Sequence, residues 1–172
     1  ALVAVHYYTS EDEAESLASE IGGMALHADL RDPSNAEDMV SRVVSEMRGL
    51  DVCVANSGLY PPEPRPIWEI GSNRWESTVM SNLSVTANTA RSFLSHASRQ
   101  GTGSLVLVGS TAGIYGEAGH SDYAAAKGAI TTGLLLSLKN EVSRIGSVRV
   151  NAVAPGWTMT PKKVESGLDE EI

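Results

Sequence analysis

The feature that most constrains the fold of this chain is a regular alternation of short apolar runs with longer stretches of helical periodicity. Strands that are apolar throughout, rather than at every second position, are typically buried on both faces. When such strands alternate with helices along a chain, they form a parallel sheet that the helices cover. The sequence therefore predicts an α/β fold with a doubly wound parallel sheet. The predicted strands lie at residues 2–7, 24–28, 51–55, 105–108 and 148–153.

The helical stretches begin at recognisable residues. Ser10 is the predicted N-cap of a helix over residues 11–21, and Pro33 suits the first turn of the next helix. Two long helices are expected over residues 73–99 and 121–144, because their apolar residues recur at helical spacing. A proline-rich loop precedes the first of these helices, and a glycine-rich loop precedes the second.

Polar residues follow the predicted strands directly, where a parallel sheet binds its ligands. In open α/β sheets that place is the crevice outside the carboxyl ends of the strands. We therefore expect these residues to line one crevice. They are Tyr7, Tyr8, Thr9, Asp29, Asn56, Ser57, Gly58, Gly109, Ser110, Thr111, Pro155, Gly156, Trp157 and Thr158.

Tyr123 and Lys127 are spaced so that they share one face of a helix. A free phenol has a pKa of about 10 and is a poor acid or base at neutral pH. A nearby ammonium group favours the phenolate and lowers that pKa, so the pair could exchange a proton with a carbonyl or alcohol oxygen. Taken alone, this spacing is common by chance and indicates a tyrosine packed beside a solvated lysine.

Ser110 changes this interpretation. It lies 13 residues before Tyr123, just past a buried strand, where a hydroxyl can hydrogen-bond a substrate oxygen. Serine is the second residue of its glycine-rich segment, whereas the nucleophile elbow of hydrolases needs serine third in G-x-S-x-G. His120 is the one histidine near this region, and it is expected to be a loop residue rather than a base.

With these residues in place, the chain resembles the compact type of the short-chain dehydrogenase/reductase family over essentially its whole length. Ser110, Tyr123 and Lys127 match the catalytic serine and the Y-x-x-x-K motif of that family. Three further segments and one asparagine match in order and spacing: Asp29 with Leu30, Ala55 to Gly58, Asn82, and the P-G segment from Pro155 to Thr160. The sequence around these motifs most resembles that of 3-oxoacyl-carrier-protein reductases. Sugar and polyol dehydrogenases share these features.

The resemblance implies a Rossmann-like fold, one nucleotide-binding and catalytic domain over residues 1–172, and hydride transfer between a carbonyl and a secondary alcohol. It makes Tyr123 the general acid or base, with Lys127 lowering its pKa, Ser110 orienting the substrate oxygen and Asn82 holding a water. It also implies the cofactor contacts, which are Tyr7, Tyr8, Asp29, Leu30, Asn56, Ser57, Gly58, Tyr123, Lys127, Pro155, Gly156, Thr158 and Thr160.

Two parts of the family pattern have no counterpart in these residues. They are the first strand with its T-G-x-x-x-G-x-G loop, and the C-terminal part beyond Ile172. The glycines at 101–103 and 113–116 do not have the spacing of a phosphate-binding loop. The resemblance therefore implies a partial chain that does not contain the phosphate cradle.

The cofactor is expected to be NADP(H) rather than NAD(H). An acidic residue at the end of the second family strand accepts hydrogen bonds from the ribose 2′-hydroxyl and repels a 2′-phosphate. Tyr7 stands at that position here, and no carboxylate precedes Glu11. Tyr8, with the two hydroxyl residues after it, could donate to a phosphate, and His6 could add charge if protonated. A basic partner is expected from the phosphate loop.

Composition and net charge limit the classes of partner that this protein is expected to bind. The net charge of −8 argues against nucleic acid and anionic membranes, which both need a basic surface. One cysteine, Cys53, no long apolar run and no basic leader favour a cytoplasmic protein. We expect a small-molecule substrate, no metal site, and a homodimer or homotetramer, since the helix over residues 121–144 is apolar around much of its girth.

Alternatives to a carbonyl reductase of this kind stay open. One is a sugar or polyol dehydrogenase of the same family. Another is a sensor that binds nucleotide without catalysis, because a fold does not fix a function. A third is an epimerase or dehydratase of the extended branch, which shares Y-x-x-x-K. The intact Ser110, Tyr123 and Lys127 argue against the sensor, and the context of Asn82 argues against the extended branch.

Overall fold

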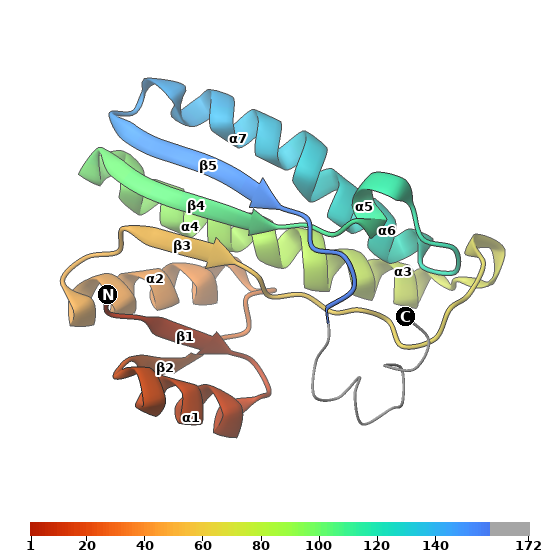
Figure 1. Cartoon of the computed structure of the whole chain (residues 1–172), viewed down its shortest axis with the longest axis horizontal. Coiled ribbons are helices and arrows are strands. Elements are labelled where there is room, and N and C mark those ends of the chain that lie inside the picture. The colour runs from red at the N-terminus through yellow and green to blue at the C-terminus, as the bar shows by residue number, and fades with distance from the viewer. Residues whose placement is uncertain (159–172) are drawn as a thin grey trace.

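The computed structural model describes residues 1–158, and all of its strands there are parallel. One pair joins β1 (Ala4–Tyr7) to β2 (Met24–His27). A three-stranded sheet has the order β3 (Val52–Ala55), β4 (Thr102–Val108) and β5 (Ser147–Val153). Figure 1 shows the five strands side by side with the helices packed around them. The predicted α/β fold with a parallel, Rossmann-like arrangement is confirmed.

Helices separate the strands, as the pattern predicts. Helix α1 packs on β1 and β2, α4 on β3 and β4, and α7 on β5, while α2 lies beside α4 (Figure 1). The long helical regions continue through π-helical turns at Met80–Ser84 and Ile130–Leu134. The helices are α1 (Glu11–Ile21), α2 (Pro33–Met47), α3 (Ser72–Val79), α4 (Val85–Gln100), α5 (Ala112–Tyr115), α6 (Ser121–Ala129) and α7 (Leu135–Glu141).

Some boundaries differ from the prediction. Ser10 precedes α1, but its side chain makes no capping hydrogen bond. The carboxylate of Asp32 instead caps α2 by accepting from the backbone N–H of Ser34. Strand β4 begins at Thr102, earlier than its apolar run, because Gly101 ends α4 abruptly in the left-handed region with φ 76°.

The core lies between the three-stranded sheet and its helices. Phe93, Leu105, Leu107 and Ile130 are fully buried in it. The exposed apolar surface of the helical region over residues 121–144 is smaller than predicted, because most of its leucines are partly buried against this core. Leu136 is the leucine of α7 that stays half exposed, at 50%.

Strand β3 was expected to be buried, and this is wrong for part of it. Val52 is 56% exposed and Val54 is 57% exposed. The reason is that the side chains of β3 alternate between two faces: Cys53 and Ala55 pack on the core beside α4, so Val52 and Val54 point to the opposite face.

His6 joins the two sheets across a groove between β1 and β3. Its Nε2 donates to the carbonyl oxygen of Ala28 at 2.8 Å, and its Nδ1 accepts from the hydroxyl of Ser57 at 3.2 Å. Burial lowers the pKa of His6, in agreement with a neutral ring that donates at one nitrogen and accepts at the other. This neutral bridge holds the end of β1 against the loop that follows β3.

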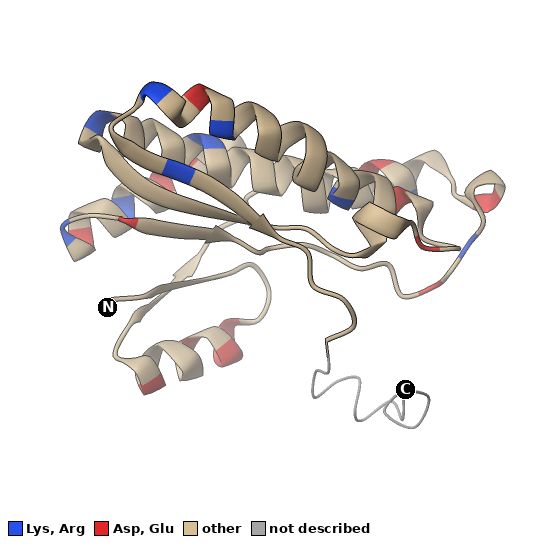
Figure 2. Cartoon of the chain, turned by 45° about the horizontal axis from the view of Figure 1, so that its top comes forward, with Lys and Arg blue, Asp and Glu red and all other residues tan. Residues whose placement is uncertain are grey.

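Charges are unevenly distributed over the molecule. Figure 2 shows acidic residues on α1, whereas the basic residues lie elsewhere. Residues 1–30 contain no lysine or arginine, so Arg31 is the first basic side chain of the chain. Within residues 1–158, no helix is both long and apolar enough to cross a bilayer.

Candidate active site

A cavity of about 320 Å³ opens at the carboxyl ends of β3, β4 and β5. The loops after these strands reach it because parallel pairing brings their ends to one edge of the sheet. Helix α6 and the π-helical turn before α4 supply the remaining walls. The lining residues that the sequence predicted are Asn56, Gly58, Asn82, Gly109, Ser110, Thr111, Tyr123, Lys127, Pro155, Gly156, Trp157 and Thr158.

Ser110, Tyr123 and Lys127 converge in this cavity. Ser110 follows β4, and its hydroxyl accepts from the backbone N–H of Ala112 at 3.2 Å and acts on the phenol of Tyr123 from the neighbouring helix. Lys127, one turn further along α6, holds its Nζ atom over the ring of Tyr123, 5.7 Å from the ring centroid. That ammonium group is almost fully buried and donates to the carbonyl oxygen of Val108 at 3.0 Å.

The pKa of Tyr123 is raised above the ordinary value of a phenol. Burial raises it most, the hydroxyl of Ser110 lowers it, and the negative charge of Glu117 raises it. The expected lowering of this pKa by Lys127 stays a prediction. Burial lowers the pKa of Lys127 itself.

Two close approaches require glycine. A Cβ on Gly58 would lie 2.6 Å from Oδ1 of Asn82 and 3.3 Å from Nζ of Lys127. A Cβ on Gly113 would lie 2.5 Å from the backbone nitrogen of Gly128, where α5 meets α6. The second contact holds α6 tightly against the loop that carries Ser110.

Asn82 is fully buried in the π-helical turn and uses its amide on the backbone. Its Nδ2 donates to the carbonyl oxygens of Leu59 at 2.8 Å and Thr78 at 2.9 Å. Its Oδ1 accepts from the backbone N–H of Leu59 at 3.3 Å. Asn82 therefore fixes the segment after Gly58, and its expected role in holding a water stays a prediction.

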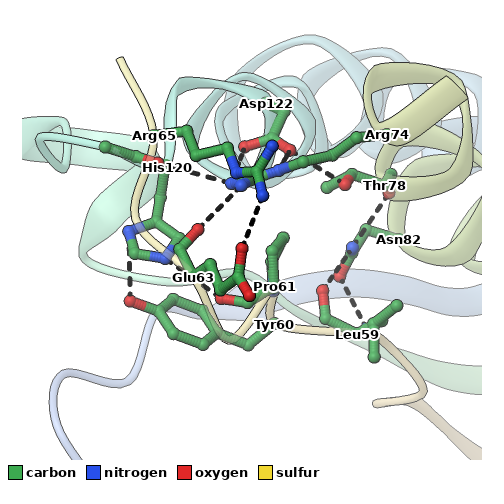
Figure 3. Close-up of polar contacts among 11 residues, drawn as sticks. Leu59, Tyr60, Pro61, Glu63, Arg65, Arg74, Thr78, Asn82, His120 and Asp122 are labelled. Carbon is green, nitrogen blue, oxygen red and sulfur yellow. Dashed lines mark hydrogen bonds and ion pairs between the residues drawn. The ribbon is translucent and has the colours of Figure 1, made fainter. Parts of the chain in front are cut away.

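A buried ion pair braces the start of α6. Asp122 is fully buried, and its carboxylate accepts from Nε of Arg74 at 2.9 Å and from the hydroxyl of Thr78 at 3.0 Å. Arg74 also donates to the carbonyl oxygens of Glu63 at 2.7 Å and Gly119 at 3.4 Å. Figure 3 shows how Arg74 on α3 thereby joins the proline-rich loop to the residues before Tyr123.

The structure adds Tyr60 and Glu117 to the cavity wall, which sequence reasoning missed. The hydroxyl of Tyr60 donates to Oε1 of Glu117 at 2.5 Å, and its ring stands edge-on to Tyr123 with centroids 5.0 Å apart. His120 stacks on Tyr60, and its Nε2 donates to the carbonyl oxygen of Pro61 at 3.0 Å (Figure 3). As expected, His120 is a loop residue just before α6.

The predicted single crevice is divided in two. A second cavity, of about 640 Å³, lies at the ends of β1 and β2 and shares Gly58 and Leu59 with the first. The remaining predicted residues line it: Tyr7, Tyr8, Thr9, Asp29, Leu30 and Ser57. Thr160 lies outside the described residues.

Arg31 is a basic residue of the second cavity that sequence reasoning did not find. Its Nη2 donates to the hydroxyl of Tyr8 at 2.6 Å, and its guanidinium lies 4.8 Å from the centroid of that ring. Nε and Nη2 also bind the carboxylate of Asp29, at 2.8 Å and 2.6 Å. The expectation that His6 could add charge is wrong, since burial lowers its pKa. The hydroxyl of Tyr7 donates to Glu11 at 2.9 Å.

Comparison with known proteins identifies the family of this chain. The family model described as short chain dehydrogenase matches residues 1–171. The cis-4-hydroxycyclohexanecarboxylate dehydrogenase of Sinomonas cyclohexanicum is 34% identical over 166 residues, which are 95% of this chain and 64% of that protein. The 3-oxoacyl-[acyl-carrier-protein] reductase of Staphylococcus aureus is 29% identical over 175 residues, which are 99% of this chain and 69% of that protein.

A solved structure shows the same fold. NAD⁺-bound xylitol dehydrogenase superposes with a TM-score of 0.86 at 22% identity, over 99% of this chain and 66% of that one. The chain thus spans about two thirds of the length of the relatives that it matches.

The brace under α6 gives a first prediction. Replacing Arg74 by alanine leaves the carboxylate of Asp122 buried without its cation, which typically costs about 3–5 kcal/mol. We expect urea unfolding of the full-length R74A protein at pH 7 to show a loss of this size. Arg65→Ala is the matched control, because its ion pair with Glu63 is largely exposed and should change the free energy of unfolding far less.

The same pair makes stability depend on pH. Burial raises the pKa of Asp122, but hydrogen bonds from Arg74, Thr78 and the backbone of Tyr123 outweigh it, so the net pKa is lowered. The contribution of this carboxylate is therefore present above its unfolded pKa, about 3.9, and is lost as the pH falls through the lowered folded value. Equal unfolding midpoints for R74A and R65A at pH 7 would contradict the bracing role.

Proposed function

Because the chain belongs to the short-chain dehydrogenase family, we propose that the protein is a nicotinamide-dependent oxidoreductase that interconverts a carbonyl and a secondary alcohol. The observation that carries this proposal is the convergence of Ser110, Tyr123 and Lys127 in one cavity, with Nζ of Lys127 over the ring of Tyr123. The intact set of three argues against a sensor that has lost its chemistry.

The two adjoining cavities fit an elongated dinucleotide. They meet at Gly58, where a Cβ would fill the space beside Asn82 and Lys127. The nicotinamide end would lie against Asn56, Gly58, Pro155, Gly156 and Thr158, which line the first cavity. The adenosine end would lie in the second cavity, against Tyr7, Tyr8, Asp29, Leu30 and Ser57.

In the proposed reaction, the side chains of the protein supply the proton and hold the substrate oxygen in position. When bound, the reduced nicotinamide supplies a hydride, which carries the two electrons of the reduction to the carbonyl carbon. The hydroxyl of Tyr123 donates its proton to the carbonyl oxygen, so that the carbonyl gains one hydride and one proton. Ser110 holds that oxygen beside the phenol. In oxidation, the phenolate takes the proton back from the alcohol.

Reduction needs the protonated form of Tyr123, which is the general acid for a carbonyl oxygen. A phenol is protonated at neutral pH, and burial and the charge of Glu117 raise its pKa further from neutrality. We propose that Lys127 lowers this pKa and hydrogen-bonds the ribose of the nicotinamide, as the family resemblance implies.

We propose that the protein prefers NADP(H). The strand end that would carry a discriminating acid carries Tyr7, and Arg31 supplies a cation in the same cavity. The contacts of Arg31 use Nε and Nη2, which leaves Nη1 to donate to a phosphate. Two carboxylates, Glu13 and Asp29, also line this cavity, and Arg31 is ion-paired with Asp29, so the proposed phosphate contact depends on Nη1 of Arg31.

The proposed substrate is a small carbonyl or alcohol compound. The sequence relatives named above support a 3-oxoacyl-type reductase as one candidate, and a sugar or polyol dehydrogenase is the alternative. A panel of carbonyl compounds with NADH and NADPH in parallel is the direct test of the class. Conversion of no compound in the panel by the full-length protein would contradict the proposed activity.

We predict that Tyr123→Phe abolishes turnover while the protein still binds cofactor. The phenylalanine ring fills the same space, but it has no proton to exchange. General acid–base catalysis contributes about 10²–10⁴-fold, so a variant that keeps more than about a hundredth of the wild-type rate would contradict the assignment. Fluorescence titration of the reduced cofactor measures binding separately.

The proposed preference for NADP(H) can be tested by changing the charge of the second cavity. Wild-type protein should use NADPH better than NADH, and Tyr7→Asp should lower kcat/KM for NADPH by repelling its phosphate. Arg31→Met should lower kcat/KM for NADPH about tenfold, or about 1.4 kcal/mol, while NADH changes little. Arg91→Met on the exposed face of α4 is the control for loss of one positive charge. A tenfold preference of the wild type for NADH would refute the cofactor assignment and leave the enzyme class standing.

We also predict that the full-length protein is a homodimer or homotetramer. The half-exposed Leu136 lies on α7, in the helical region for which the family resemblance implies a subunit interface. Light scattering at micromolar concentration should give a multiple of the subunit mass, and Leu136→Lys should shift it towards the monomer. A monomeric wild type would refute this.

A further inference from the structure

Glu117 lines the active-site cavity but exchanges no proton and orients no atom in the proposed reaction. Among the described residues that line this cavity, only Glu117 and Lys127 are charged. Lys127 is 4% exposed and is held by the carbonyl of Val108. The side chain of Glu117 is 26% exposed. A substrate that enters the cavity therefore meets a carboxylate as the accessible charge.

The carboxylate of Glu117 is held in place from one side. The hydroxyl of Tyr60 donates to Oε1, and Nδ1 of His120 lies 3.6 Å from the same oxygen. No residue in the described part of the chain donates to Oε2, which is left to accept a hydrogen bond from a ligand. The ring of Tyr60 stands edge-on to Tyr123, and Glu117 and Tyr123 line the same cavity.

The charge of Glu117 also reaches the reaction centre. It acts on the phenol of Tyr123, although the two side chains share no hydrogen bond in the described structure. A charge that acts on Tyr123 also acts on any charged group of a substrate bound beside it, because the effective dielectric constant within a cavity is lower than that of bulk water.

We infer that Glu117 selects the substrate: the site takes an uncharged carbonyl compound with a hydroxyl group close to its carbonyl carbon, and excludes compounds with a carboxylate there. A hydroxyl can donate to Oε2, and hydrogen bonds to a charged acceptor are the stronger kind. A carboxylate offers no donor and is repelled. This inference rests on the proposed function, and it favours a sugar-like or polyol-like substrate over a free oxo acid.

Three ketones of similar size test the inference in the full-length protein. They are 4-hydroxybutan-2-one, which carries a hydroxyl, methyl acetoacetate, which is neutral without a donor, and acetoacetate, which carries a carboxylate. We expect kcat/KM for the hydroxyketone to exceed that for acetoacetate at least about tenfold, or about 1.4 kcal/mol. Methyl acetoacetate should fall between them.

Glu117→Gln removes the charge and keeps an amide oxygen that can accept from Tyr60. In this variant the preference for the hydroxyketone over acetoacetate should fall about tenfold or more, chiefly because acetoacetate improves. Glu76→Gln is the matched control, since it removes one negative charge from the exposed surface of α3 and should leave the preference unchanged. A wild type that reduces acetoacetate as well as the hydroxyketone would overturn the inference, as would an unchanged preference in E117Q.

Calorimetric binding of the same compounds to Tyr123→Phe, with cofactor present, separates this inference from the proposed function. If no ketone is turned over but binding still favours the neutral compounds and E117Q abolishes that difference, the selectivity stands and the proposed reaction fails. If turnover occurs and neither binding nor rate distinguishes acetoacetate, the reaction stands and the selectivity fails.

Discussion

The buried ion pair between Arg74 and Asp122 is the interaction on which the geometry of the active site depends. Two charges removed from water are stable only when hydrogen bonds satisfy their remaining atoms. Here Thr78 and two backbone carbonyls do so, and those carbonyls belong to the proline-rich loop and to the loop before α6. The ion pair therefore connects α3, the proline-rich loop and the loop before α6, and no local sequence pattern indicates that these segments lie together. Tyr123 follows Asp122 directly, so its place is set by this brace and by the tight contact of Gly113 with Gly128.

The brace also determines which charges Tyr123 experiences. Because the proline-rich loop is held against α6, Tyr60 reaches the cavity and anchors Glu117 beside the phenol. Lys127, which carries the opposite charge, is turned towards the backbone of β4. Burial and the charge of Glu117 both raise the pKa of this phenol. The same placement of charge links the acid strength of Tyr123 to the choice of substrate, since Glu117 acts on both.

The fold and the central residues of the site could be predicted from the sequence, because their signals are local. Apolar runs mark each strand, and the spacing of Tyr123 and Lys127 places them on one helix face whatever surrounds them. The contacts of Arg31 with Tyr8 and of Tyr60 with Glu117 join residues 23 and 57 positions apart, and no local pattern announces them. The rise in the pKa of Tyr123 could not be predicted from the sequence either, since it depends on burial and on how the loop that carries Glu117 folds.

Asn82 explains how the two cavities are kept in a fixed relation. Its amide binds both the N–H and the carbonyl of Leu59, the residue that the cavities share with Gly58. The side chain of Asn82 points inward from a π-helical turn, which interrupts a helix that otherwise packs on the sheet. His6 fixes the other side of the division by binding Ser57, which precedes Gly58. The backbone between the cavities is thus held from two directions, by one buried amide and one neutral imidazole. A ligand that spans both cavities would meet a wall that is already in place, so little ordering of the chain would oppose its binding.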